Sequence, residues 1–250
     1  MRLLIDIGNT RVKWALVDRK LFAKGDASDW SLVQKQKDEF QSIWISCVGK
    51  DSTFKQVVKQ LRELSDIEPI SVKVSAKACG LVNQYKSLDR LGVDRWVAAI
   101  GARALRPTGE LIIIDVGTAV TIDCVDAESN YLGGVILPGF AMMHDSLVGK
   151  TAGISSLRQD PVAIIGQNTQ ECVNSGAHYG LVGAIERIVS EIRVDHGGDS
   201  TQLLITGGDA EQVIASSHLP FDHQANLLFD GLITISECSD QAENTLSSDL

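Results

Sequence analysis

The chain has 250 residues, 44% of them hydrophobic, which is enough for one or two folded domains and excludes a largely disordered protein. Its 23 basic and 32 acidic residues give a net charge of −9 without any basic cluster, so nucleic acid is not expected as a partner. The five cysteines are widely spaced and include no C-x-x-C pair. This spacing predicts reduced thiols rather than a disulfide framework or a zinc site.

The N-terminal residues show no export signal. Asp6 interrupts the first apolar run before it reaches the length of about 7–15 residues that a signal peptide needs. No segment reaches the roughly 18 apolar residues of a membrane-spanning helix. We therefore expect a cytoplasmic protein without membrane contacts.

The first predicted element is a β-hairpin with an acidic turn. The apolar residues 3–5 lead into Asp6-Ile7-Gly8, and an alternating apolar run follows at residues 12–17. This pattern predicts a strand, a tight glycine turn and a returning strand.

The rest of the first half alternates between strands and helices. Residues 43–48 are predicted as a buried strand and residues 54–64 as a helix with one apolar face. A short strand at 70–74 and a helix at 96–104 follow. This alternation favours an α/β fold.

The hairpin pattern then returns. Residues 112–119 repeat the apolar run and its acidic glycine turn, with Asp115 in the place of Asp6, and residues 120–125 form the returning strand. Pro107-Thr108-Gly109 lies between the copies as a natural join. The repeat predicts an internal duplication, with one domain at residues 1–108 and a second at 109–236.

The second half continues with three further elements. Residues 131–137 are predicted as a strand, residues 181–192 as an amphipathic helix that serves core or dimer packing, and residues 203–206 as a short buried strand. Residues 237–250 are polar and acidic, and we expect them to form a disordered tail.

The acidic turns carry the strongest functional signal. Asp6 and Asp115 end apolar strands, where an unpaired carboxylate would cost several kcal/mol. If the two halves face each other, both carboxylates enter one cleft, and at about 4 Å they would repel by roughly 4 kcal/mol. A metal–triphosphate complex supplies the cations that this arrangement needs, and the glycines allow backbone N–H groups to approach phosphate oxygens.

Several motifs together resemble the type III pantothenate kinases, which belong to the superfamily of acetate and sugar kinases, Hsp70 and actin. The resemblance runs from residue 1 to about residue 235. In chain order, the motifs that carry it are Asp6-x-Gly-Asn-Thr-x-x-Lys13, Gly92-Val93-Asp94-Arg95, Asp115-x-Gly-Thr-Ala, Gly133-Gly134-x-x-x-Pro138-Gly139 and Thr206-Gly207-Gly208-Asp209.

The resemblance implies a fold and a reaction. The fold is two RNase H-like halves, as in actin-like ATPases, with the active site in the cleft between them. The reaction is ATP-dependent phosphorylation of pantothenate to 4'-phosphopantothenate, the first step of coenzyme A biosynthesis. Mg²⁺ with ATP and a monovalent cation, K⁺ or NH₄⁺, are the implied cofactors. A homodimer is also implied, with part of the pantothenate pocket supplied by the second subunit.

The resemblance also assigns roles to individual residues. Asp94 would be the catalytic base, Asp6 would help to hold Mg²⁺ through ATP, and Asp115 would bind the monovalent cation. The expected ATP contacts are Asp6, Ile7, Gly8, Asn9, Thr10, Arg11, Val12, Lys13 and Thr118. The expected pantothenate contacts are Tyr85, Gly92, Val93, Asp94, Arg95 and Thr169.

Other interpretations of these residues stay open. Asp94 also suits the start of a helix, where a carboxylate stabilises the first turn without any catalytic role. A single Asp-x-Gly is a common hairpin turn, and Gly207-Gly208 also suits a plain turn after a strand. At the level of function, one alternative is a regulatory protein of the same family without kinase activity, and another is an actin-like or Hsp70-like ATPase without a small acceptor.

Overall fold

The computed structural model describes residues 1–18, 20–148 and 163–248. Its contacts group the chain into two compact units. The first contains Met1–Thr108, Ser129–Tyr131 and Asn226–Leu250, and the second contains Gly109–Glu128 and Leu132–Ala225. Each unit is described separately below.

The first unit is built on a five-stranded sheet in the order β3-β2-β1-β4-β5. β1 runs antiparallel to β2 and parallel to β4. The strands are β1 (Arg2–Ile7), β2 (Val12–Asp18), β3 (Lys20–Asp26), β4 (Ser42–Cys47) and β5 (Ile70–Ser71). Alternating side chains of these strands enter two separate hydrophobic clusters, one on each face of the sheet.

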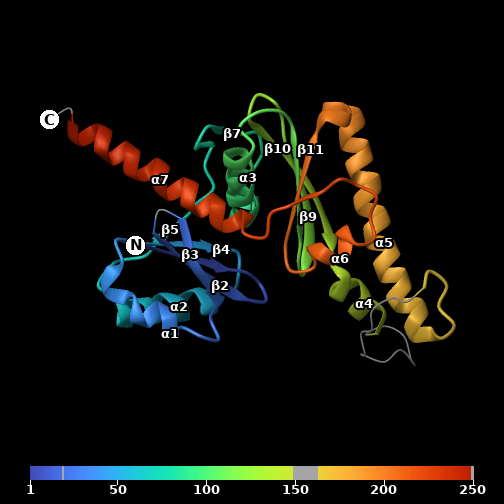
Figure 1. Cartoon of the computed structure of the whole chain (residues 1–250), viewed down its shortest axis with the longest axis horizontal. Coiled ribbons are helices and arrows are strands. Elements are labelled where there is room, and N and C mark those ends of the chain that lie inside the picture. Colours follow the sequence, from blue (N-terminus) through green and yellow to red (C-terminus); the bar gives the residue numbers. More distant parts are fainter. Residues whose placement is uncertain (19, 149–162, 249–250) are drawn as a thin grey trace. The chain divides into compact units, whose positions relative to one another are not determined.

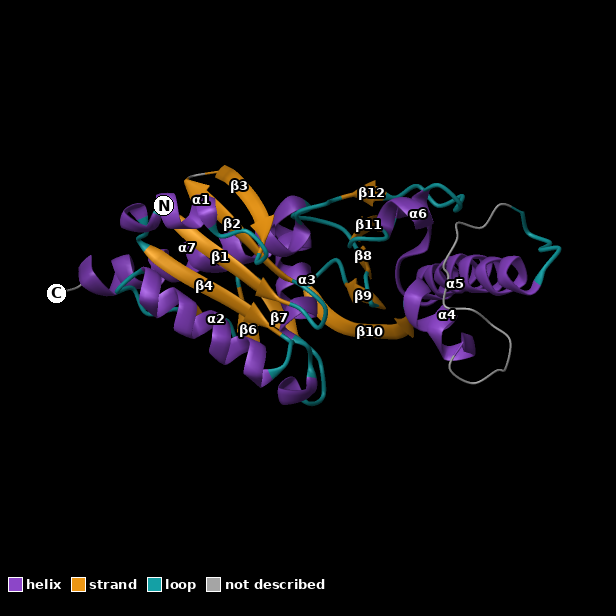
Figure 2. Cartoon of the chain, turned by 90° about the horizontal axis from the view of Figure 1, so that it is seen from below, coloured by secondary structure: helices purple, strands orange, loops and turns teal. Residues whose placement is uncertain are grey.

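Helices cover both faces of this sheet (Figures 1 and 2). α1 (Ser31–Lys35) and α2 (Asp51–Leu64) pack on the face that Leu3, Ile5 and Ile7 share. α3 (Val93–Leu105) and α7 (Leu227–Ser248) pack on the opposite face, against Leu4 and its neighbours. Two short 3-10 helices, η1 (Lys37–Glu39) and η2 (Leu88–Arg90), complete the helical segments of this unit.

α7 and α3 touch backbone to backbone. A Cβ at Gly231 would overlap the Val97 carbonyl oxygen, and a Cβ at Gly101 would lie 2.7 Å from the Gly231 nitrogen. The two glycines therefore let the helices approach more closely than any larger residue would allow.

The C-terminal segment differs from the sequence expectation in two ways. α7 continues to Ser248, whereas residues 237–250 were expected to form a disordered tail. These residues contain no Gly or Pro, and a polar helix can extend beyond the core that holds its first turns. The residues from Asn226 onward group with the first unit, although the expected second domain continued to residue 236.

The second unit is built on strands in the order β12-β11-β8-β9-β10. They are β8 (Leu111–Val116), β9 (Ala119–Val125), β10 (Asn130–Pro138), β11 (Gln202–Thr206) and β12 (Asp222–His223). The strand order continues beyond β10 with the hairpin of β7 (Leu81–Asn83) and β6 (Lys77–Ala78). β7 pairs with Asn130 and Tyr131 at the start of β10, and these two residues group with the first unit.

α5 (Thr169–Ile192) supplies most of the helical core of this unit. Leu181, Ile185 and Val189 pack against the faces of β8 and β9 that carry Ile112 and Ile122. Asn168 caps the helix by accepting a hydrogen bond from the Glu171 N–H at 2.9 Å. The remaining helical segments are α4 (Phe140–Val148), the π-helical η3 (Arg193–Gly197), η4 (Gly198–Ser200) and α6 (Ala210–Ile214).

The sequence patterns predicted the main elements correctly and located their ends less well. Both hairpins, the strand of β4 and the helices α2 and α3 are confirmed. α5 begins twelve residues before the predicted stripe at 181–192, because the side chains of its first half are mostly small or polar and form no apolar stripe.

Among the described helices, none has the length and apolar character that a membrane span requires. The described cysteines are free thiols in the structure.

Candidate active site

The acidic turn of the first unit is fixed by backbone hydrogen bonds. Across the β1–β2 hairpin, the Gly8 N–H donates to the Arg11 carbonyl at 3.0 Å. The Val48 and Gly49 N–H groups both donate to the Ile7 carbonyl at 3.0 Å. A Cβ at Gly49 would lie 2.7 Å from the Gly8 carbonyl oxygen, so glycine is needed for this close contact.

Asp6 lies in the middle of a row of three polar residues on neighbouring strands. Its register partners are Lys13 on β2 and Ser46 on β4. Residues in register share a face of the sheet, and the row lies on the face that carries Leu4 and is covered by α3. Asp6 is half-buried, Lys13 is exposed, and Ser46 is fully buried.

Ser46 is an unusual member of this row. Its side chain has no exposed surface, and its Oγ has no hydrogen-bond partner among the described residues. Such a hydroxyl lowers the stability of the folded protein by about 1–3 kcal/mol unless a partner is supplied.

The residue after Ser46 also responds to the acids nearby. Burial raises the pKa of the Cys47 thiol, and the Asp6 and Asp51 carboxylates raise this pKa further.

Asp94 is the second residue of α3, and the local backbone makes room for its carboxylate. Its Oδ1 accepts a hydrogen bond from the Arg95 N–H at 2.8 Å. A Cβ at Gly92 would lie 2.5 Å from this same oxygen. Gly92 also approaches the residue that follows β4, because its Cβ position lies 3.8 Å from Val48 Cγ1. This position suits a catalytic base, and it equally suits a carboxylate that only stabilises the first turn of α3 through the helix dipole.

Arg95 lies beside the first of three neighbouring aromatic rings. Its guanidinium lies 5.9 Å from the centre of the Tyr85 ring, within the range of a cation–π interaction. The Tyr85 and Tyr131 rings lie 6.5 Å apart, and Tyr131 meets Trp96 edge-on at 5.8 Å. Arg95 is 6% exposed, so its charge is largely removed from water next to Asp94 in the sequence.

The second unit repeats the acidic turn in a tighter form. In the β8–β9 hairpin the Gly117 N–H donates to the Ala119 carbonyl at 3.1 Å, and this turn is one residue shorter than the first. The Gly139 N–H donates to the Thr118 carbonyl at 3.0 Å, and a Cβ at Gly139 would lie 2.7 Å from that oxygen.

Asp115 is the counterpart of Asp6. Its register partners are Thr121 on the antiparallel neighbour and Thr206 on the parallel neighbour. Gly207 follows Thr206 with a positive φ of 101°, and a Cβ there would lie 2.6 Å from Asp115 Oδ1. Two features therefore require glycine at position 207: the positive φ, and the close contact with the Asp115 carboxylate.

The expected site residues are divided between the units. The first unit contains the turn of Asp6 to Lys13, the start of α3 from Gly92 to Arg95, and Tyr85. The second contains Asp115, Thr118 and Thr169, with Thr169 exposed at the start of α5. Ile7 is a core residue, so only its backbone is open to a ligand. Ser46 and Gly49 were not predicted from the sequence; the strand register singles out Ser46, and the close contact with Gly8 singles out Gly49.

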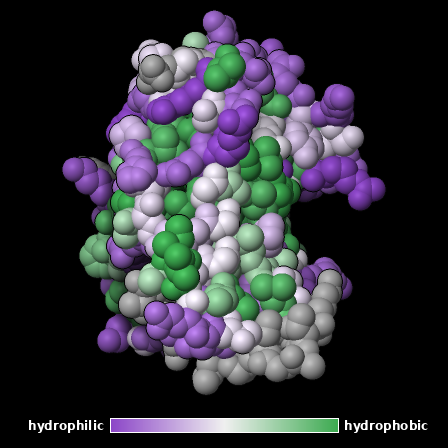
Figure 3. Space-filling view, turned by 90° about the vertical axis from the view of Figure 1, so that its right-hand side faces the viewer, coloured by the Kyte–Doolittle hydropathy of each residue, from purple (hydrophilic) through white to green (hydrophobic). Residues whose placement is uncertain are grey.

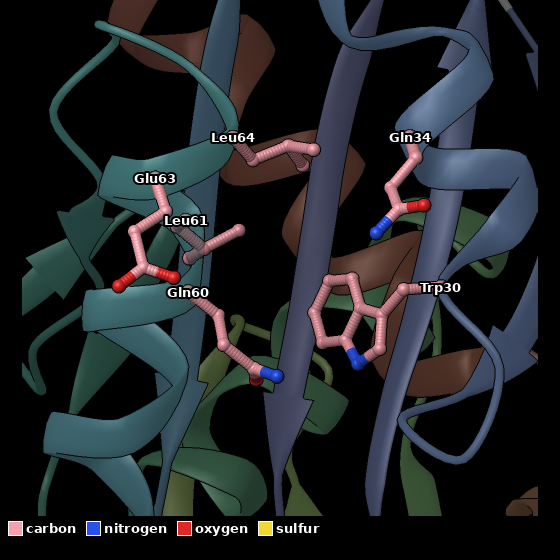
Figure 4. A pocket seen from close by; sticks show the side chains of 6 residues that line it. All are labelled: Trp30, Gln34, Gln60, Leu61, Glu63 and Leu64. Carbon is pink, nitrogen blue, oxygen red and sulfur yellow. The ribbon is translucent and has the colours of Figure 1, made fainter.

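A pocket elsewhere in the first unit does not belong to this site. Its volume is about 210 Å³, and it lies between α1 and α2 (Figure 4). These helices cover the face of the sheet opposite to Asp6. The side chains that line the pocket are Trp30, Gln34, Gln60, Leu61, Glu63 and Leu64.

The described residues contain no group of three acidic, His or Cys side chains that could hold a metal alone. A metal ion at Asp6 would therefore need most of its ligands from a bound substrate and from water. Mg²⁺ bound to a nucleotide has this property, because phosphate oxygens and waters complete its octahedral shell.

Comparison with known proteins identifies a family. The family model described as type III pantothenate kinase matches residues 2–191. The type III pantothenate kinase of Verminephrobacter eiseniae is 38% identical, over 93% of this chain and 96% of that protein. The protein of the same name from Nitrosococcus oceani is 30% identical, over 95% of this chain and 94% of that protein.

Solved structures support the fold. A Baf family transcriptional activator from Campylobacter jejuni has a TM-score of 0.60 at 21% identity, covering 96% of this chain and 99% of that one. The activator of 2-hydroxyisocaproyl-CoA dehydratase from Clostridium difficile, solved with bound ADPNP, has a TM-score of 0.54 at 12% identity, covering 99% and 97%.

Proposed function

Because this chain belongs to the type III pantothenate kinase family, whose reaction is the ATP-dependent phosphorylation of pantothenate to 4'-phosphopantothenate, we propose that Asp94 is the catalytic base of that reaction. The observation that carries this assignment is the space that Gly92 leaves for the Asp94 carboxylate at the start of α3. The reaction opens coenzyme A biosynthesis, and the family relationship favours it over a regulatory role or a simple ATPase.

The turn from Asp6 to Lys13 suits the phosphates of ATP. Its glycine brings backbone close to a ligand, Asn9 and Thr10 are exposed donors, and Lys13 adds a positive charge. Asp6 would hold the Mg²⁺ that accompanies ATP. The bound ion supplies neutralisation of the charge on the phosphoryl oxygens during transfer.

The residues at α3 would act on pantothenate. Its hydroxyl oxygen forms a bond to the γ-phosphorus while the bond from that phosphorus to the bridging oxygen of ADP breaks, and Asp94 accepts the hydroxyl proton. Arg95 follows Asp94 in the sequence and lies 5.9 Å from the centre of the Tyr85 ring, and Arg95 and Tyr85 would bind the pantothenate carboxylate and amide groups. A loose transition state needs positioning more than a strong base, so an ordinary aspartate is adequate.

Two further assignments concern the second unit. Asp115 would bind the monovalent cation, with K⁺ or NH₄⁺ as the expected ion, and Thr118 would contact ATP. Asp115 suits a cation because its Oδ1 and the Val116 carbonyl oxygen both lie against the Cβ position of Gly207, so two oxygen ligands are available on the same side of the turn. Thr169, exposed at the start of α5, would contact pantothenate.

Exposed hydrophobic side chains on the second unit are consistent with a homodimer. Figure 3 shows hydrophobic side chains at the surface on the side where α5 lies. Ile136 is 61% exposed and Ile165 78% exposed, and Met142 and Tyr179 are also exposed. Hydrophobic surface of the kind that Figure 3 shows is typical of an interaction surface, and a second copy of the chain is the partner that we propose.

The direct test of the proposed function is a substrate screen. Purified protein with Mg–ATP and K⁺ is expected to convert pantothenate into phosphopantothenate with one ADP formed per turnover, measured by a coupled ADP assay and by mass spectrometry. Sugars, acetate and glycerol serve as competing acceptors. ADP formation without any acceptor, or with one of these three alone, would contradict the assignment.

Gly92→Ala tests whether the carboxylate position matters. The added Cβ would displace Asp94 Oδ1, a flexible side-chain atom, so the fold should survive while kcat falls by about tenfold or more. The measurements are kcat and the melting temperature. In an Asp94→Asn background, Gly92→Ala should cause little further loss, because the two substitutions remove the same interaction. Additive losses would contradict this coupling.

A further inference from the structure

Ser46 is a buried polar residue to which the proposed reaction assigns no role. Buried hydroxyls are nearly always hydrogen-bonded, and an exception requires an explanation. Ser236, which is equally buried in the same unit, donates to the Ile233 carbonyl at 2.7 Å and accepts from Arg2 Nη1 at 2.7 Å. Ser42, on the same strand and face as Ser46, accepts from Trp44 Nε1 at 3.1 Å. Ser46 Oγ has no such partner among the described residues.

Asp6 is the acidic residue directly beside Ser46 in the sheet. The two residues are in register on adjacent parallel strands, and neighbouring strands lie about 4.8 Å apart. A serine hydroxyl at this distance can donate to the carboxylate without any movement of the backbone. It would approach Asp6 from the side opposite to Lys13, which leaves the strand end for a ligand.

The second unit repeats the arrangement with a different residue. Thr206 is in register with Asp115 on the parallel neighbour, as Ser46 is with Asp6. The sequences around them differ, Ile-Ser-Cys-Val-Gly in one case and Ile-Thr-Gly-Gly in the other. A hydroxyl beside the acid in both units indicates a shared chemical requirement rather than a chance serine.

We propose that Ser46 is a positioning residue for Asp6: its hydroxyl donates a hydrogen bond to the Asp6 carboxylate when Mg–ATP is bound, and so fixes the orientation of that carboxylate toward the metal. The role rests on the proposed assignment of Asp6 to Mg–ATP. Ser46 itself touches neither the metal nor the reacting atoms. A hydroxyl kept for this purpose stabilises the complex and not the free protein.

If Ser46 has this role, its hydroxyl affects the binding of Mg–ATP but does not stabilise the free protein. Ser46→Ala tests this difference. The free variant should melt at the wild-type temperature or above it, because the substitution removes an unpaired buried hydroxyl. The rise in melting temperature on addition of Mg–ATP should be smaller than in wild type. The KM for Mg–ATP should increase by about tenfold, while the KM for pantothenate stays unchanged.

Three matched variants complete the experiment. Ser46→Thr keeps the hydroxyl, as the second unit does at Thr206, and should retain the response to Mg–ATP. Ser42→Ala removes a paired hydroxyl from the same strand and should leave the response unchanged. Asp6→Asn should abolish most of it.

The outcomes distinguish the proposal from the function on which it rests. If Ser46→Ala lowers the melting temperature and leaves the Mg–ATP response intact, Ser46 is structural and the proposal is wrong. Equal losses in Ser46→Ala and Ser46→Thr would show that side-chain size matters and not the hydroxyl, which also overturns it. A full Mg–ATP response in Asp6→Asn would instead refute the assignment of Asp6.

Discussion

Asp94→Asn is expected to lower kcat by about 10²–10⁴ while the protein stays folded. Asparagine has nearly the same shape, and its side-chain oxygen can still accept the Arg95 N–H that Asp94 Oδ1 accepts at 2.8 Å. It cannot take the proton of the pantothenate hydroxyl. The loss should therefore be in kcat, with a smaller change in the KM for either substrate. Steady-state kinetics and a melting curve measure the two effects separately.

Asp89→Asn is the matched control for this experiment. Asp89 is an exposed acid five residues earlier, and its contact with Arg90 lies at the surface. Its replacement should leave kcat within about twofold of wild type, because exposed ion pairs contribute little. Turnover by Asp94→Asn equal to that of the control would leave Asp94 with only the role of a first-turn residue in α3.

Local patterns were sufficient for the two hairpins because their signals are local. Each consists of an apolar run, an Asp-x-Gly turn and a second run, and the backbone bonds that close the turns join residues two or three apart. The same holds for α2, whose apolar positions recur at helical spacing. The resemblance in the motifs then gave the family, which the comparisons confirm.

Contacts between distant segments were beyond the reach of these patterns. β12 has only two residues, and its pairing with β11 defines it rather than its own sequence, whereas the short strand predicted at 70–74 is present as β5. The return of α7 to the first unit depends on the contact of Gly231 with Val97, more than a hundred residues apart. Neither Gly231 nor Gly101, the glycine of α3 that meets it, is distinguishable from a helix-weakening glycine until both helices are placed.

The candidate site shows the same division. Asp6 and Asp115 were singled out because an acid at the end of an apolar strand is conspicuous in a sequence, and Asp94 was assigned through the family resemblance. Ser46 was not singled out, since a serine within an apolar run resembles any other strand residue. Only the pairing of Asp6 with Ser46, and of Asp115 with Thr206, reveals the common position.

The second large effect is expected from the monovalent cation. At equal ionic strength, activity in K⁺ or NH₄⁺ should exceed activity in Na⁺, and Asp115→Asn should lose this advantage together with a factor on the order of a hundred in kcat/KM. A unit charge about 4 Å from the ion contributes roughly 4 kcal/mol at an effective dielectric near 20, and carbonyl oxygens retain part of this in the variant. Each 1.36 kcal/mol corresponds to about a tenfold change in rate.

The cation should act through Asp115 specifically. Glu128→Gln removes an exposed acid from the same unit and should leave both the rate and the preference for K⁺ unchanged. A titration of K⁺ into Na⁺ buffer gives the half-activating concentration, which should rise in Asp115→Asn and stay constant in Glu128→Gln. Equal activity of the wild-type protein in Na⁺ and in K⁺ would refute the cation assignment, and the close approach of Gly207 to Asp115 would then serve only the packing of the turn.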